Sequence, residues 1–123
     1  MSLQKIKAFL FIPLLCLAPW LLAAPSPSYN IANGKKIYDK SCFTCHAAGV
    51  ADAPKTHDVD AWKERFMMAA KAEKTDPQSA TAMDYLVNQV VKGKMAMPPK
   101  GLCNNCSNSD FADAIQYMAS AQQ

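Results

Sequence analysis

The chain has 123 residues, of which 13 are basic and 10 acidic, so its formal net charge at pH 7 is +3. Two of the basic residues, Lys5 and Lys7, lie in the first 24 positions. The rest of the chain contains eleven basic and ten acidic residues. Nothing in this balance suggests a nucleic-acid-binding protein, which calls for a clustered basic footprint. The length beyond residue 24 suffices for one domain and not for two.

The first 24 residues have the layout of a secretory signal peptide. A short basic start is followed by an apolar stretch over 8–22 and by the small residues Ala23 and Ala24. That order is typical of an export signal that is removed from the mature protein. An uncleaved membrane anchor is the alternative, because Pro25 is a poor residue to follow a scissile bond. We therefore expect a signal peptide or anchor over 1–24, a linker over 25–29 and a folded domain over 30–123.

Beyond the linker, apolar residues recur at helical spacing and no run alternates as a strand would, which predicts an all-α domain. A first helix is expected over 31–40, with Asn30 as its cap. Gly34 inside it is tolerable if another helix crosses closely there. Residues 47–58 are small and polar, as expected of a loop beside a cofactor. A second helix is expected over 61–74, capped by Asp60.

The second half of the chain predicts two more helices. One is expected to start with Asp76 as its cap and Pro77 at its first position, and to end at Gly93. Its apolar stripe consists of Met83, Leu86, Val87, Val90 and Val91. Residues 94–105 are rich in Pro, Gly and Asn and indicate a loop. The last helix is expected to begin at Ser107, whose side chain and that of Asp110 suit a capping box.

The most informative motif is Cys42-Phe43-Thr44-Cys45-His46, which reads C-x-x-C-H. This is the pattern of c-type haem attachment. Two thiols at this spacing can form thioethers to the two vinyl groups of one porphyrin, and the adjacent His46 can bind the iron. We therefore expect one covalently attached haem c. A structural disulfide or half of a zinc site is the alternative for Cys42 and Cys45.

The second axial ligand of the iron is expected to be Met97. Pro98 and Pro99 follow it, so the backbone there has lost two donors and much of its freedom and can hold the sulfur in place. Met95 is the alternative in the same loop. His57 could complete a bis-histidine site only through a tight wrap of the loop after His46, so we expect it to be a solvent-exposed loop histidine.

A second C-x-x-C pair is formed by Cys103 and Cys106. In an exported protein an even number of thiols normally means that every thiol is used. With Cys42 and Cys45 bound to haem, Cys103 and Cys106 would form a disulfide. A redox-active dithiol and a zinc site joining both pairs remain alternatives, although no βαβ pattern surrounds this pair and the two pairs are widely spaced.

These residues together resemble the class I cytochromes c, and most closely the small bacterial cytochrome c5 type. The resemblance rests on the C-x-x-C-H motif, on Gly34, Tyr38 and Tyr117, and on the run 96–101 followed by the second cysteine pair. It implies a small fold of about four helices around one haem, whose first and last helices pack across the glycine. It also implies a disulfide near the haem edge, and a Pro54 carbonyl that accepts a hydrogen bond from His46. Residues 68–81 make the chain longer than the family pattern.

The residues and the resemblance predict a one-electron carrier and not an enzyme, because two filled axial positions leave oxygen and peroxide no ready site. The expected partners are a respiratory donor and a terminal oxidase or reductase in the periplasm, with membrane association only through an uncleaved N-terminus. Lysines flanking the motif and the Met97 loop could steer an acidic partner: Lys35, Lys36, Lys40, Lys92, Lys94 and Lys100. The alternatives are a haem sensor or peroxidase-like protein with an open sixth coordination site, and a thiol oxidoreductase using Cys103 and Cys106.

Overall fold

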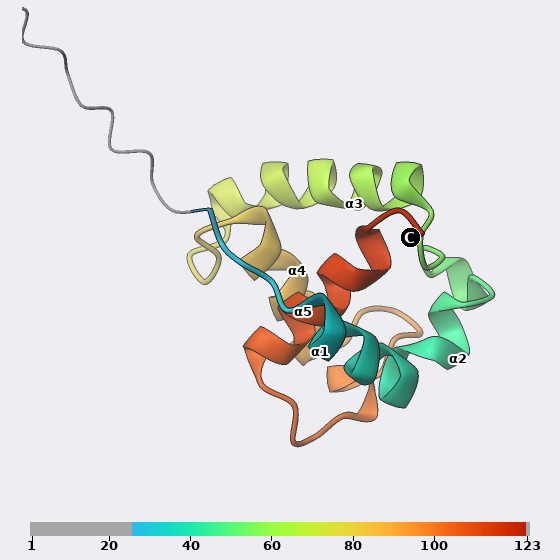
Figure 1. The fold of residues 1–123 in the computed structure, drawn as a ribbon. Coiled ribbons are helices and arrows are strands. Elements are labelled where there is room, and N and C mark those ends of the chain that lie inside the picture. Colours follow the sequence, from blue (N-terminus) through green and yellow to red (C-terminus); the bar gives the residue numbers. More distant parts are fainter. Residues whose placement is uncertain (1–25, 123) are drawn as a thin grey trace, which may run out of the picture.

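The computed structural model describes residues 26–122, and these fold as a cluster of helices (Figure 1). The predicted signal peptide or anchor, residues 1–24, lies outside the described residues. Within 26–122 there is no strand, only one isolated bridge between Lys94 and Met97, and no helix is long and apolar enough to cross a membrane. The α-helices are α1 (Ile31–Ile37), α2 (Phe43–His46), α3 (Val59–Ala72), α4 (Ala82–Lys92) and α5 (Asn108–Ala119). The all-α prediction is therefore confirmed.

The first and last helices cross in close contact, with α5 in the middle of the molecule and α1 across it (Figure 1). Gly34 is buried at the crossing, where a Cβ atom would overlap the backbone carbonyl of Asp113 and approach Tyr117 Cβ to 3.0 Å. The Asn33 side-chain amide donates to the carboxylates of Asp110 and Asp113, both at 2.9 Å. The glycine predicted to allow a close crossing therefore does so.

The start of α5 has the predicted capping box. The Ser107 hydroxyl accepts from the Asp110 backbone N–H at 3.2 Å, and the Asp110 carboxylate accepts from the Ser107 N–H at 2.9 Å. Hydrogen bonds from Asn33 and Ser107 hold the pKa of the Asp110 carboxyl below its ordinary value. The charged carboxylate thus accepts a hydrogen bond from the Ser107 N–H at the helix start. Its negative charge also interacts favourably with the positive end of the helix dipole.

The core forms where α5 meets the other helices. Side chains of α5 occupy its centre, and aromatic and aliphatic residues of the first half of the chain and of α4 pack around them. The Tyr38 and Tyr117 rings lie 5.3 Å apart. The largest buried members are Tyr38, Trp62, Met83, Val87, Phe111, Ile115 and Met118.

The first helical segment is longer than predicted. It does not end at Lys40, because α1 continues through a π-helical turn, Tyr38–Cys42, directly into α2 and ends at His46. A π-helical turn inserts one extra residue and so rotates everything after it about the helix axis. The haem motif is therefore part of the same helical rod that packs on α5 through Gly34.

Two predicted helix starts were wrong. Helix α3 begins at Val59 with Asp58 as its cap, whose carboxylate accepts from the Ala61 N–H at 3.0 Å, and it gives way to a 3₁₀ turn at Glu73–Thr75. Helix α4 begins at Ala82 with Thr81 as its cap. Asp76 caps nothing, since its carboxylate accepts from the Gln78 N–H and the Ser79 hydroxyl within a local turn, each at 2.9 Å.

Candidate functional site

The two cysteines of the C-x-x-C-H motif lie at the end of the π-helical turn and in α2. Cys42 is half-buried and Cys45 is exposed. Burial, with a smaller contribution from neighbouring Cys45, raises the pKa of the Cys42 thiol to about 11. Neither cysteine is joined in a disulfide, so both can form a thioether to an external group.

His46 is buried with its ring in a single defined tautomer. Its Nδ1 lies 2.8 Å from the Pro54 carbonyl oxygen, which can only accept, so Nδ1 carries the hydrogen. Burial lowers the pKa of the imidazole and keeps the ring neutral. The other ring nitrogen, Nε2, therefore presents a lone pair, as an iron ligand must. The predicted Pro54 hydrogen bond is present.

Trp62 stacks on the His46 ring. The two rings are stacked, with their centroids 5.8 Å apart and an interplanar angle of 24°. The indole N–H of Trp62 donates to the Lys55 carbonyl at 2.8 Å, which fixes the tryptophan against the same loop. The sequence gave no signal for the contact between Trp62 and His46, because that contact joins α3 to the end of α2.

The two candidate methionines differ in their surroundings. Met95 is 93% exposed at the tip of a turn, whereas Met97 is half-buried. Backbone hydrogen bonds between Lys94 and Met97 close the turn in both directions, at 3.1 and 2.9 Å. Gly93 precedes it at φ +77°, and a Cβ there would lie 2.8 Å from the Met97 carbonyl oxygen. This backbone holds Met97 and leaves Met95 in solvent.

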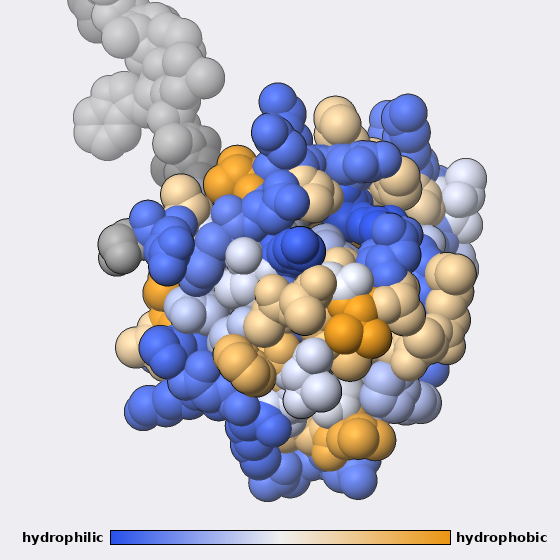
Figure 2. All heavy atoms as spheres, turned by 90° about the vertical axis from the view of Figure 1, so that its right-hand side faces the viewer, coloured by the Kyte–Doolittle hydropathy of each residue, from blue (hydrophilic) through white to orange (hydrophobic). Residues whose placement is uncertain are grey.

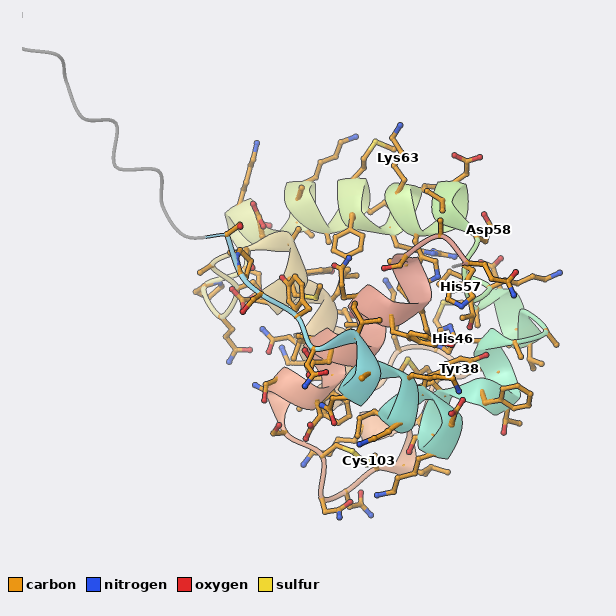
Figure 3. All side chains as sticks on the ribbon, viewed as in Figure 1. Tyr38, His46, His57, Asp58, Lys63 and Cys103 are labelled. Atoms are coloured by element: carbon orange, nitrogen blue, oxygen red, sulfur yellow. A yellow bond between two sulfur atoms is a disulfide. The ribbon has the colours of Figure 1, made fainter. Side chains whose placement is uncertain are left out.

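Cys103 and Cys106 are joined by a disulfide. Their exposures are only 2% and 8%, and both belong to the hydrophobic core, so a substrate thiol has no access to them. Figure 3 shows Cys103 at the end of the molecule away from His57. The disulfide uses both thiols of this pair, which contradicts the zinc alternative. Among residues 26–122, no group of three or more His, Cys, Asp or Glu side chains could hold a metal ion.

His57 lies in a loop as predicted, but it is half-buried and not solvent-exposed. Its ring Nδ1 donates to the backbone carbonyl of Ser120 at 2.7 Å, and its edge packs on Tyr117. The expectation of an exposed histidine was wrong because the partner of the ring comes from the far end of the chain.

Large apolar side chains are exposed on the segments that carry these groups. Figure 2 looks at the side of the molecule on which α2 lies in Figure 1, and apolar residues gather in the middle of that face with hydrophilic residues around them. In α2, in the loop after it and in the Met97 loop, the exposed large apolar residues are Phe43, Val50, Met95 and Leu102.

Comparisons with known proteins agree with this geometry. Residues 29–118 match the family described as cytochrome C oxidase, cbb3-type, subunit III. The chain is 41% identical over 96 residues to cytochrome c5 of Ectopseudomonas mendocina, which covers 78% of this chain and 98% of that protein.

Two solved structures are also similar. One is a chain of the crystal structure of an electron transfer complex of nitrite reductase with cytochrome c, with a TM-score of 0.55 and 34% identity, covering 75% of this chain and 95% of that one. The other is a mono-heme ferrocytochrome c from Shewanella putrefaciens, with a TM-score of 0.53 and 32% identity, covering 80% of this chain and 100% of that one.

A neutral, oriented histidine beside two cysteines that form no disulfide, in a small helical domain with these relatives, defines the class: the chain belongs to the class I cytochromes c. Among them it is similar to cytochrome c5. It has one covalently attached haem c and is an electron carrier, as the sequence predicted.

Proposed function

We propose that Cys42 and Cys45 bind the haem, that His46 and Met97 are its axial iron ligands, and that the protein carries electrons between respiratory partners in the periplasm. The observation that carries the proposal is the His46 imidazole, which is buried and donates from Nδ1 to the Pro54 carbonyl. When bound, the haem supplies an iron that cycles between two oxidation states. The protein supplies the ligands, their orientation and the exclusion of water.

On the histidine side, the chain restrains the ring at two places. Pro54 accepts from Nδ1, which fixes the tautomer and makes Nε2 more basic, and Trp62 stacks on the ring. A ring held in this way does not reorient when the charge at the metal changes. That is what rapid electron transfer without rearrangement requires.

Met97 is the proposed sixth ligand of the iron. It is half-buried in a turn closed by hydrogen bonds to Lys94, and two prolines without backbone N–H groups follow it. A thioether in this position favours reduced iron and raises the midpoint potential. It also fills the coordination sphere, which favours a carrier over a sensor or a peroxidase-like protein.

The surface around the site suits brief contacts with other redox proteins. Exposed apolar side chains such as Phe43 and Leu102 accompany lysines on the same segments. Lys35 is paired with Asp39 at 2.6 Å, so the steering charge is carried by the other flanking lysines, such as Lys36 and Lys94. One solved relative belongs to a complex with nitrite reductase. We infer a terminal oxidase or reductase as the acceptor, through a small and transient interface.

Export of the protein follows from the signal-like residues 1–24 in this proposal. A periplasmic carrier is expected if the signal is cleaved, and a membrane-tethered carrier if it is not. Mass spectrometry of the mature protein distinguishes the two, since cleavage removes Lys5 and Lys7 together with the apolar stretch.

The ligand set is tested by exchanging the two methionines of the loop separately. In Met97→Ala, we expect the weak far-red band of a methionine–ferric iron bond to vanish and the reduced protein to bind carbon monoxide. Its midpoint potential should fall by about a tenth or more of the roughly 0.8 V range that axial ligands span. Met95→Ala is the matched control, because Met95 is almost fully exposed in the same turn, and it should behave as the wild type.

Two results would contradict the proposal. If Met95→Ala loses the band and Met97→Ala keeps it, the ligand is misassigned although the carrier function stands. If the reduced wild-type protein itself binds carbon monoxide readily, the sixth position is open and the sensor or peroxidase-like alternative is favoured.

A further inference from the structure

The segment 54–57 hydrogen-bonds to His46 through Pro54 and Thr56 and to its neighbours through Lys55 and His57. The Pro54 carbonyl accepts from the His46 ring at 2.8 Å, and Lys55 accepts from Trp62, which stacks on that ring. Thr56 donates to the His46 backbone carbonyl through its N–H at 2.8 Å and through its hydroxyl at 3.2 Å. This segment therefore sets the position of the imidazole from the ring side and from the backbone side.

The fourth residue of the segment, His57, makes no bond to His46 and connects the segment to the end of α5. Its backbone N–H donates to the Met118 carbonyl and its ring Nδ1 donates to the Ser120 carbonyl, both at 2.7 Å. The ring edge packs on Tyr117, with centroids 5.1 Å apart at 76°. Figure 3 shows His57 beside the end of α5 and close to His46. Three contacts thus tie the loop to a helix that is fixed in the core.

The backbone at His57 has a cost that these contacts offset. Its φ is +65°, a left-handed conformation that glycine adopts without strain and that is uncommon for other residues, although less so for asparagine, aspartate and histidine. A glycine would fit this backbone without strain but would provide no ring. The imidazole instead provides a hydrogen bond to Ser120 and packing on Tyr117.

We propose that His57 is a positioning residue for the proximal iron ligand: by tying residues 54–57 to the end of α5, it holds the Pro54 carbonyl against His46 Nδ1. The inference rests on His46 being the iron ligand, as proposed above. A firm hydrogen bond to Nδ1 makes the imidazole a stronger donor, which stabilises oxidised iron. Loosening the segment should therefore weaken that bond and raise the midpoint potential.

The test uses three variants of the haem-loaded protein. His57→Gly removes the ring while its backbone accepts the left-handed conformation. His57→Asn keeps a donor at the atom equivalent to Nδ1 and also tolerates that conformation. Ala51→Gly is the matched control, since Ala51 is exposed in the same loop at φ +51° and touches neither His46 nor α5 through a hydrogen bond in the structure. The readouts are the NMR solvent-exchange rate of the His46 Nδ1 proton and the midpoint potential.

In His57→Gly, we expect the His46 Nδ1 proton to exchange about tenfold faster and the midpoint potential to rise. His57→Asn should stay within about twofold of the wild-type exchange rate, and Ala51→Gly should match the wild type. An unchanged exchange rate and potential in His57→Gly would overturn the inference. So would equal effects of His57→Gly and His57→Asn, or of His57→Gly and Ala51→Gly, because the donor to Ser120 would then not be the cause. A wild-type spectrum without an iron-bound imidazole at His46 would instead overturn the ligation on which the inference rests.

Discussion

The crossing of α1 and α5 allows the sharpest test of how this fold is held together. In Gly34→Ala, a methyl group enters a space that the backbone carbonyl of Asp113 already fills. Considered alone, α1 should gain about 1 kcal/mol from replacing glycine by alanine in a helix. Overpacking typically costs about 1–3 kcal/mol, and here the obstacle is backbone, so the upper end applies. We expect a net loss of about 2 kcal/mol in the free energy of unfolding.

Urea unfolding of the haem-loaded protein, followed by far-ultraviolet circular dichroism, measures this change. In a domain of this size, such a loss corresponds to a fall in Tm of roughly 8–16 °C. Ala32→Gly is the matched control, because Ala32 is exposed on the same helix and should lose only about 1 kcal/mol of helix propensity. A Gly34→Ala protein as stable as the wild type, or more stable, would refute the close-crossing argument, since propensity alone would then decide the outcome.

Two further predictions concern α5 and the loop before it. Replacing Cys103 and Cys106 together by alanine should lower the free energy of unfolding by about 2 kcal/mol, the chain-entropy value for so short a loop, and urea unfolding of oxidised wild type and variant measures it. A variant as stable as the wild type would show that the disulfide contributes nothing to the fold. The pKa of Asp110 is lower in the folded protein than its ordinary value of 3.8, so its contribution is complete above that value and is lost as the pH falls through the folded pKa. Unfolding measured at about pH 5 and about pH 3 should therefore show a smaller loss in Asp110→Asn than in the wild type, and equal losses in both would contradict this role.

Features encoded by neighbouring residues were predictable from the sequence. The capping box at Ser107 depends on two side chains three positions apart, and Asn30 caps α1 as predicted, accepting from the Asn33 N–H. The haem motif could likewise be recognised because its chemistry requires fixed spacing. The contact between Gly34 and α5 needed one further assumption, a second helix close by, and the structure confirms it.

Features that depend on distant contacts were missed. Asp76-Pro77 is locally as good a helix start as Thr81, but Asn88 of α4 donates to the Gln78 carbonyl and the Ser79 hydroxyl, and these bonds hold 76–79 as a turn. The π-helical turn that extends the first helix to His46 has no simple sequence pattern. The stacking of Trp62 on His46 likewise joins segments whose approach no local pattern encodes.

The packing of α1 against α5 limits the order in which this protein can fold. The helix that carries the haem motif packs on the last helix of the described chain, so its apolar side has no partner until α5 is available. A nascent or partly translocated chain must therefore expose that side, and with it two thiols, until α5 has emerged. Cleavage anywhere before α5 would in turn release the helix at the opposite end, so the domain should be lost as a whole and not shortened from one side.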